Sequence, residues 1–324
     1  MSNKLILKVF YFLSALVFLS CGCASKQAYI KKQTYAKKQA YINKEPSTGD
    51  VFVINKVPFY KQNSNTCGPA ALASVLEYWG ADFTPENIIR SVYSLELRGT
   101  LDFEISYYAR QFNFWSKYYQ SSFDDLKGKI REGIPLIILE KESPVLNSYH
   151  YIVVFGFDEG ERRIIAHTGR KASAWIPYNR FFKTWKRGDF GAIVVCPPEK
   201  VDWPLDPQGY IYLGYLLEKK EFFDKAAQIY LKAINIEPGS EVAYFNLGNV
   251  YVKLNKYTEA EEAFQKTIEL NPGFADAYNN LACVYLSENK NLEEAQRLTQ
   301  KALELNPEGK EYYIDTLDKI REKL

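Results

Sequence analysis

The chain has 324 residues, of which 47% are hydrophobic and 25% charged, so it is long enough and apolar enough for two packed domains and is not a disordered segment. Eight lysines and no acidic residue precede residue 45; subtracting their eight charges from the net charge of +2 leaves the remainder at about −6, which argues against a nucleic-acid partner. The five cysteines show no CxxC and no paired spacing, so we predict no disulfide framework, no metal site and no cofactor.

Residues 1–20 are typical of an export signal. Lys4 and Lys8 give a basic start, and a short apolar run follows them. The run is too short for a comfortable membrane span and ends in small residues, which favours cleavage over anchoring.

Two cysteines follow the leader in a stretch that resembles a bacterial lipobox. Cys21 follows Ser20 and Cys23 follows Gly22, so both have the small preceding residue, and neither has the preferred Leu three residues upstream. The choice between them stays open. The resemblance implies a lipid anchor in a membrane of the bacterial cell envelope, on the extracytoplasmic side; the alternative is a plain secretory signal with two incidental cysteines.

Residues 21–50 are predicted to form a tether rich in Lys and Tyr. Three six-residue units of the type Lys-Gln-Ala-Tyr-Ile-Lys cover 26–43, and a period of six fits neither a helix stripe nor a heptad. A solvated linker is the preferred interpretation, and a basic segment that lies on anionic lipid headgroups is the alternative.

Residues 51–200 are predicted to hold the chemistry. Apolar residues from Leu72 to Trp79 repeat at helical spacing, so a helix is expected to bury one face, with Cys67 at its N-terminus. The helix dipole favours an anion there and lowers the pKa of a thiol. Gln62, five residues upstream, can supply an amide donor to an oxyanion. His150 opens an apolar run that predicts a buried strand, where its imidazole can serve as a base.

The motif Gln-x4-Cys-Gly-Pro-Ala-Ala around Cys67, with His150-Tyr-Ile-Val-Val 83 residues later, resembles the C39-like cysteine peptidases of the papain-like superfamily. The resemblance covers about 51–198 and implies an α+β papain-like fold. It also implies that Cys67 is the nucleophile, His150 the general base and Gln62 part of the oxyanion hole.

The sequence departs from that family at one position. The family usually places an Asp on the strand after the His strand, and here we interpret His167 as the residue at that position. A neutral imidazole accepts one hydrogen bond but cannot stabilise an imidazolium as a carboxylate does. His167 is therefore a doubtful third member, and the sequence leaves open whether the chain turns over substrate.

Further elements of this domain follow from local signals. A second helix is expected from Thr84-Pro85-Glu86, and a third capped by Ser122. Strands are expected at 135–140, 150–157, 163–168, 174–177 and 190–196.

Residues 201–324 resemble a short array of tetratricopeptide repeats. Two units of 34 residues, 207–240 and 241–274, align in register, and a third from 275 to about 309 contains one extra residue. Small residues stand at the eighth and twentieth positions and large ones at the fourth, seventh, eleventh and twenty-fourth, which allows two antiparallel helices to pack closely. Residues 310–324 have the spacing of a capping helix.

The combination predicts a membrane-anchored cysteine peptidase whose repeats recruit a protein or peptide substrate or a protein partner. Two alternatives remain: a peptidase-like scaffold that no longer cuts, and a related cysteine amidase or transglutaminase that acts on cell-wall peptides. The chain has no ATP-binding GxxxxGKS motif and no multi-span membrane segment, so leader-peptide cleavage within a transporter is not supported.

Overall fold

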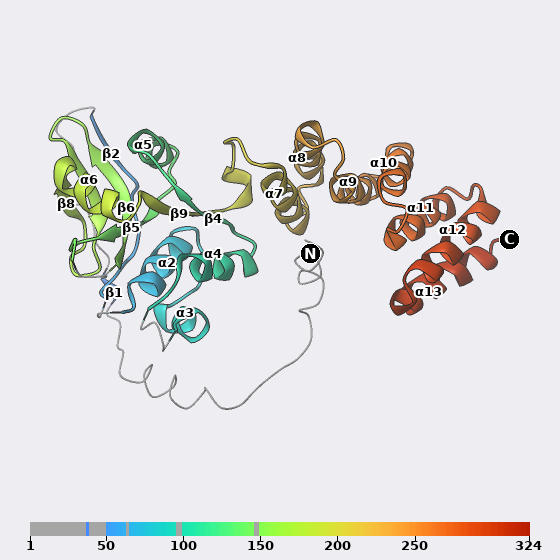
Figure 1. Cartoon of the computed structure of the whole chain (residues 1–324), viewed down its shortest axis with the longest axis horizontal. Helices are drawn as coiled ribbons and strands as arrows, with labels where there is room; N and C mark the ends of the chain where they lie inside the picture. The colour runs from blue at the N-terminus through green and yellow to red at the C-terminus, as the bar shows by residue number, and fades with distance from the viewer. Residues whose placement is uncertain (1–36, 39–49, 63–64, 95–98, 146–148) are drawn as a thin grey trace. The chain divides into compact units, whose positions relative to one another are not determined.

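The computed structural model describes residues 37–38, 50–62, 65–94, 99–145 and 149–324 (Figure 1). The predicted leader, most of the tether and both candidate lipidation sites, Cys21 and Cys23, lie outside these residues. The described chain divides into two compact units, one that ends at Val195 and one that begins at Cys196, except that 110–115 belong to the second unit. No helix in the described ranges is long and apolar enough to cross a membrane.

The first unit is built on a mostly antiparallel sheet. In spatial order its strands are β4 (Trp115–Gln120), β9 (Gly191–Cys196), β5 (Leu136–Lys141), β6 (Tyr149–Asp158), β7 (Arg163–His167) and β8 (Ala174–Pro177), and β2 (Val51–Val53) also pairs with β6. The last five strands in chain order are confirmed to within one residue at each end. The continuous apolar runs of β6 and β9 are buried, as expected of central strands.

In the described part of this unit the sheet is accompanied by the helices α2 (Cys67–Tyr78), α3 (Pro85–Val92), α4 (Asp102–Gln111), α5 (Phe123–Arg131) and α6 (Tyr178–Arg187). α2, α5 and α6 pack directly on its strands. Thr84 caps α3 through a reciprocal capping box, and Ser122 accepts the backbone N–H of Asp125 at the start of α5. Both caps were expected from the sequence.

Helix α2 is buried more completely than its sequence spacing predicts. Every residue from Gly68 to Leu76 is buried, so the helix is enclosed on all sides and does not present one polar face to water. Trp79, just after its end, donates its indole N–H to the carbonyl of Val195 at 2.8 Å. The element that carries Cys67 is therefore held rigidly in the centre of its unit.

A short strand from the tether joins this unit. Lys37 and Lys38 form β1 (Lys37–Lys38), which pairs antiparallel with β3 (Phe59–Tyr60). These two residues of the predicted tether are thus paired with the folded chain.

The second unit consists of successive helix pairs. They are α7 (Pro207–Lys219) with α8 (Phe223–Ile236), α9 (Glu241–Lys253) with α10 (Tyr257–Leu270), and α11 (Ala275–Ser287) with α12 (Leu292–Leu305), followed by α13 (Lys310–Arg321). Short 3-10 turns at Pro198–Lys200 and Pro307–Gly309 precede α7 and α13. Neighbouring helices pack in chain order, which is the arrangement of a repeat array.

Glycines set the distance between the two helices of the first two pairs. A Cβ at Gly214 would lie 2.5 Å from Cε1 of Tyr230, and a Cβ at Gly248 would lie 2.6 Å from Cε1 of Phe264. Both rings are fully buried. The glycines are therefore needed so that an aromatic ring can fill the space between the helices.

The third pair packs differently at the same positions. Ala282 stands where the first two repeats have Gly, and the buried Thr299 stands where they have an aromatic ring, after the one-residue insertion. Thr299 is smaller than the aromatic rings at the equivalent position, so we expect it to leave room for the methyl group of Ala282. Asn291, within the insertion, has a left-handed backbone at φ 49°.

Candidate active site

Cys67 is the first residue of α2 and its side chain is half-buried. Burial raises the pKa of the Cys67 thiol. A hydrogen bond to His150, the charge of that ring and the backbone N–H groups of Tyr151 and Gly68 outweigh burial, so that the net pKa lies below its usual value. The surroundings of the sulfur therefore favour a thiolate.

His150 lies at the start of β6, and Nε2 of its ring is 2.9 Å from the carbonyl oxygen of Thr168. Because a carbonyl only accepts, Nε2 carries a hydrogen, and Nδ1 is the nitrogen left for the Cys67 thiol. Burial lowers the pKa of His150, but the hydrogen bond with Cys67, the thiolate charge, the Thr168 carbonyl and Glu140 raise it to about 8. Cys67 and His150 thus shift each other's pKa in the directions that favour a thiolate beside an imidazolium.

Gln62 is held beside Cys67 by both its backbone and its side chain. Its N–H donates to the carbonyl of Gly169 at 2.8 Å, and its side-chain Nε2 donates to the carbonyl of Cys67 at 3.4 Å. An amide nitrogen has two hydrogens, so one remains for an oxyanion that forms at the N-terminus of α2.

Gly169 makes this position of Gln62 sterically accessible. Its φ is +75°, and a Cβ there would lie 1.8 Å from Oε1 of Gln62. Only glycine combines this backbone conformation with such a close approach.

The interpretation of His167 as the third member is corrected by the structure. His167 pairs with Val153 in the β6–β7 register, three residues along the strand from His150. Its Nε2 donates to the carbonyl of Val57 at 3.0 Å, and its Nδ1 accepts the N–H of Ser173 at 3.2 Å. Both ring nitrogens are occupied in the core, so His167 braces the fold and does not support His150.

Sequence reasoning missed two partners of His150. The Thr168 carbonyl is a backbone group and has no sequence signature. Glu140 stands directly opposite His150 in the β5–β6 register, and only the pairing of the strands reveals this.

Helix α4 borders Cys67 on another side. A Cβ at Gly68 would lie 3.0 Å from Cβ of Thr100 and 3.1 Å from Cδ1 of Ile105, so the chain around α4 contacts the start of α2. Phe103 and Tyr107, one turn apart on α4, are 62% and 64% exposed. The helix that borders Cys67 thus carries exposed aromatic side chains.

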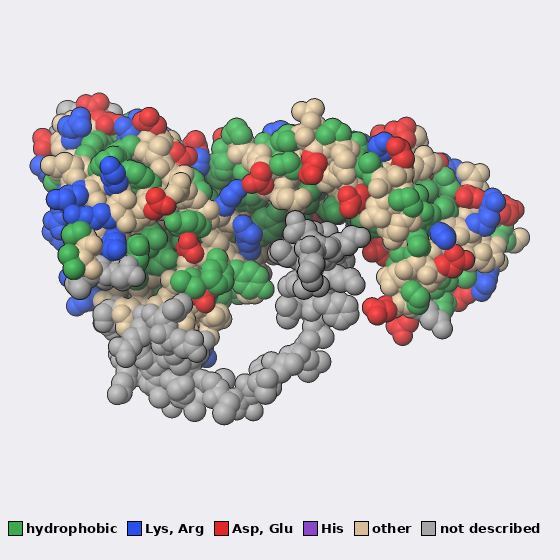
Figure 2. Space-filling view, viewed as in Figure 1, with side chains coloured by type: hydrophobic (Ala, Val, Ile, Leu, Met, Phe, Trp, Pro, Cys, Tyr) green, Lys and Arg blue, Asp and Glu red, His purple; other side chains and the backbone are tan. Residues whose placement is uncertain are grey.

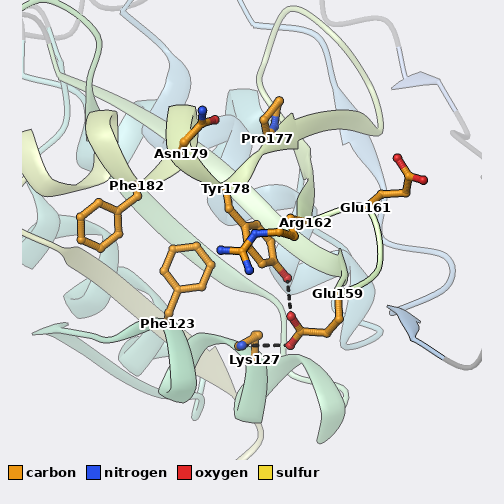
Figure 3. Close-up of a pocket in the computed structure, with 9 residues that line it drawn as sticks. All are labelled: Phe123, Lys127, Glu159, Glu161, Arg162, Pro177, Tyr178, Asn179 and Phe182. Carbon is orange, nitrogen blue, oxygen red and sulfur yellow. Dashed lines mark hydrogen bonds and ion pairs between the residues drawn. The ribbon is translucent and has the colours of Figure 1, made fainter.

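A separate concavity of about 650 Å³ lies near the β6–β7 hairpin, at the end of β6 away from His150 (Figure 3). Aromatic and charged side chains line it together: Phe123, Lys127, Glu159, Glu161, Arg162, Pro177, Tyr178, Asn179 and Phe182. Neither Cys67 nor His150 lines this concavity.

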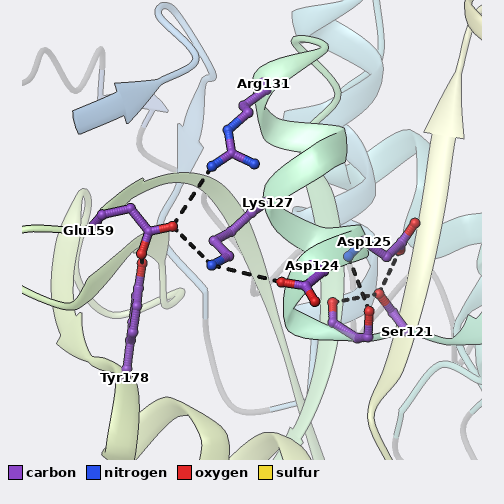
Figure 4. Close-up of polar contacts among 8 residues, drawn as sticks. Ser121, Asp124, Asp125, Lys127, Arg131, Glu159 and Tyr178 are labelled. Carbon is purple, nitrogen blue, oxygen red and sulfur yellow. Dashed lines mark hydrogen bonds and ion pairs between the residues drawn. The ribbon is translucent and has the colours of Figure 1, made fainter. Parts of the chain in front are cut away.

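The charges near this concavity are engaged in structural contacts (Figure 4). Glu159 accepts from Lys127 at 2.9 Å and from the hydroxyl of Tyr178 at 3.2 Å, and Arg131 lies 3.8 Å from it. The hydrogen bond from Lys127 is the main reason that the pKa of Glu159 lies below its usual value. The cluster joins α5 to the hairpin and α6.

Comparison with known proteins identifies both units. Residues 54–192 match the model of the Peptidase_C39 like family, and residues 242–274 and 263–297 match two tetratricopeptide repeat models. The first unit is therefore a peptidase-type domain of the C39-like class. The chain joins this domain to tetratricopeptide repeats, which are modules for binding proteins or peptides.

One solved structure similar to the chain is the first tetratricopeptide repeat of Spaghetti (RPAP3) bound to an HSP90 peptide. It has 26% sequence identity and a TM-score of 0.35, and the match covers 36% of this chain and 91% of that one. No curated protein sequence matches the chain.

Proposed function

We propose that the chain is a cysteine peptidase that acts outside the cytoplasm, that a lipid on Cys21 or Cys23 anchors it to a membrane of the bacterial envelope, and that its repeats recruit the substrate. The observation that carries the catalytic part is the hydrogen-bonded pair of Cys67 and His150, with the amide of Gln62 beside the same helix N-terminus. The anchor and the location rest on the sequence pattern of the leader.

The reaction follows from the positions of three groups. The Cys67 thiol gives its proton to His150, and the thiolate attacks the carbonyl carbon of a peptide bond. Gln62 and the first N–H groups of α2 stabilise the oxyanion. His150 then protonates the leaving amine, which leaves an acyl-thioester on Cys67. A water molecule, deprotonated by His150, attacks the thioester, and collapse of this second intermediate restores the thiol and releases the acid.

Reactivity toward iodoacetamide tests whether Cys67 is a catalytic thiol. In one chain, Cys67 is expected to be alkylated on the order of a hundredfold faster than Cys196 or Cys283 at pH 7, because its surroundings favour the thiolate whereas Cys196 is fully buried and burial raises the pKa of Cys283. Peptide mass spectrometry reads all three sites at once. Equal rates at the two accessible thiols, Cys67 and Cys283, would remove the catalytic proposal.

A peptide library separates hydrolysis from the alternatives. The wild type is expected to generate new peptide termini that Cys67→Ser does not. An amidase would release ammonia without chain cleavage, and a transglutaminase would attach an added amine. A reactive Cys67 with none of these products would favour the scaffold that does not cut, an outcome made plausible by the neutral carbonyl that Thr168 offers His150 in place of a carboxylate.

A row of polar side chains on the repeats supports a recruiting surface. Nδ2 of Asn280 donates to Oδ1 of Asn249 at 2.8 Å, and the hydroxyl of Tyr312 donates to Oδ1 of Asn280 at 3.3 Å. The row crosses α9, α11 and α13, and Tyr312 is 54% exposed. Acidic and basic side chains are interspersed over the visible face of the repeats in Figure 2.

Kinetics on two substrate lengths tests recruitment. Replacing Asn249 and Tyr312 by Ala is expected to raise KM for a polypeptide that contains the cleavage site and to leave kcat unchanged. The same double variant should cut a short peptide with wild-type KM. If the double variant changed KM equally for the polypeptide and for the short peptide, the repeats would play no part in binding the substrate.

Labelling with a radioactive fatty acid in a bacterial host tests the anchor. Either Cys21→Ala or Cys23→Ala is expected to abolish the label, and the other is expected to retain it. Label in both single variants and in the double variant would rule out both cysteines.

A further inference from the structure

We propose that Glu140 is the positioning residue that balances the positive charge of His150. The backbone carbonyl of Thr168 is neutral and cannot do this by itself. This inference rests on the proposed peptidase function. Thr168 supplies a neutral acceptor that fixes the ring and its tautomer. Glu140 supplies a formal negative charge from the neighbouring strand.

Strand register brings the two side chains together. Glu140 of β5 pairs with His150 of β6, between the pairs Leu139–Tyr151 and Lys141–Tyr149. Residues directly opposite each other in an antiparallel pair project from the same side of the sheet, with Cβ atoms about 4.5–5.5 Å apart. The Cβ atoms of Glu140 and His150 are therefore neighbours on the same side of the sheet.

Glu140 is a costly residue for a purely structural role. It is only 7% exposed, and it follows the apolar residues Ile137, Ile138 and Leu139 in a buried strand. A buried carboxylate lowers stability unless hydrogen bonds and opposite charge compensate for its lost hydration. An apolar residue would continue the strand at no such cost.

The compensation that Glu140 receives is incomplete without His150. The hydroxyl of Thr184, on α6, lies 3.0 Å from Oε2 of Glu140 and can donate to it. That hydroxyl also lies 3.0 Å from the carbonyl of Phe181, and it has one hydrogen to share. A carboxylate can accept about four hydrogen bonds, so a nearby positive charge is a further means of stabilising it.

The charged groups around Glu140 are few, and His150 is the one that titrates in the working range of pH. The pKa of Glu140 lies above its usual value on balance, because burial outweighs the lowering by Thr184, His150 and Arg180 of α6, and Glu142 raises it further. In return, Glu140 is among the groups that raise the pKa of His150, together with the Cys67 thiolate and the Thr168 carbonyl. When the proton moves from Cys67 to His150, the negative charges of both the thiolate and the Glu140 carboxylate thus favour the new imidazolium.

The test compares Glu140→Gln with Glu142→Gln in the full chain. Both substitutions remove one negative charge at nearly the same place, but Glu142 is exposed, outside the β5–β6 pairing and not assigned to the site. The rate of alkylation of Cys67 by iodoacetamide is measured from pH 5 to 10. Glu140→Gln is expected to slow alkylation of Cys67 at pH 6.5 about tenfold. Without the carboxylate, the imidazolium of His150 is less favoured, and so is the Cys67 thiolate that it stabilises. Glu142→Gln should stay within twofold of the wild type.

The NMR signals of the His150 ring protons report the pKa of His150, which would not change if Glu140 had a purely structural role. The chain has only two histidines, so selective labelling yields two ring signals, and His167→Gln identifies the signal of His150. In a Cys67→Ser background, Glu140→Gln is expected to lower the pKa of His150 by about one unit. Glu140→Asp, which keeps the charge, should recover at least half of the shift.

The outcomes separate this inference from the function on which it rests. Slow alkylation of Cys67 in the wild type would overturn the catalytic proposal, yet the His150 titration would still measure the charge pairing. A reactive Cys67 with identical behaviour of Glu140→Gln and Glu142→Gln would overturn the role of Glu140 alone. If Glu140→Gln does not fold, Thr184→Val is the second variant, and an unchanged His150 titration in it would count against the proposal.

Discussion

The two units of this chain differ in how far apart along the sequence their contacting residues lie. In the repeats, the tight contacts within a helix pair join residues 16 positions apart, such as Gly214 with Tyr230 and Gly248 with Phe264, and the polar contacts between pairs, such as Asn280 with Asn249, join residues 31 apart. In the peptidase-type unit, the site joins Cys67 to His150, and Gln62 to Gly169, across most of the domain. A change in the repeats is therefore expected to act locally and in graded steps. A change at the site can remove the chemistry and leave the fold intact.

Gly169→Ala tests the long-range side of this comparison and should have the largest effect. The new Cβ would overlap Gln62, so the side chain must leave, and hydrolysis is expected to fall about 10²–10³-fold. Alkylation of Cys67 should change little, because iodoacetamide forms no oxyanion. Gly160→Ala is the matched control, since a Cβ there meets only ordinary contacts at 3.5 Å. Full hydrolysis by Gly169→Ala would exclude Gln62 from the mechanism.

His167 gives the first unit a specific sensitivity to acid. Burial lowers the pKa of His167 to about 4, below its unfolded value of 6.5, so the unfolded chain binds more protons between those values. Stability is therefore lost as the pH falls from 6.5 to 4, by about 3 kcal/mol for this group.

Denaturant unfolding of the first unit at several pH values checks this prediction. His167→Gln is expected to be less stable at pH 7, because it loses the ring's two hydrogen bonds, but to change less on acidification. A pH dependence identical to that of the wild type would show that His167 is not the group responsible.

Gly248→Ala tests the short-range side. The methyl group would press on Phe264, and we expect the second repeat to lose about 2 kcal/mol. Hydrogen exchange should show reduced protection in α9 and α10 and little change in the first unit. Ala282→Gly is the reciprocal control in the third repeat, where we expect Thr299 to leave room for the methyl group, and its cost should be about 1 kcal/mol. Loss of protection that spreads into the first unit would contradict local behaviour.

The smallest expected effect is at the turn of the first repeat. Glu221 has a left-handed backbone at φ 61°, and the equivalent residues of the next repeats are Asn255 and Asn289, which tolerate that conformation better. Glu221→Asn is expected to stabilise the first repeat by about 0.5 kcal/mol, measured by hydrogen exchange of α7 and α8. No gain, or a loss, would mean that the side chain of Glu221 contributes more than its backbone costs.

The same difference in range explains what could be predicted from the sequence. The repeats were predictable because the residues that pack their helices recur at fixed, short spacings in each unit. Even the extra residue before α12 was visible in this spacing. Gln62, Cys67 and His150 were identifiable through a motif and a resemblance. The partners of His150 were not, because Thr168 acts through its backbone and Glu140 through strand register. The strands β2 and β3 are too short to show a periodicity, and the six residues of β4 show no alternation that would have indicated a strand.

The hydrogen bond from His150 to the Thr168 carbonyl has a consequence for how this site can vary among descendants of the chain. No single side-chain replacement deletes a main-chain oxygen, so a substitution at residue 168 costs only the contacts of the Thr168 hydroxyl with Lys171 while the imidazole keeps its acceptor. Selection to preserve the geometry would fall instead on Gly169, whose backbone turns the chain at that point. A survey of natural variants should then find diversity at 168 next to an almost fixed glycine.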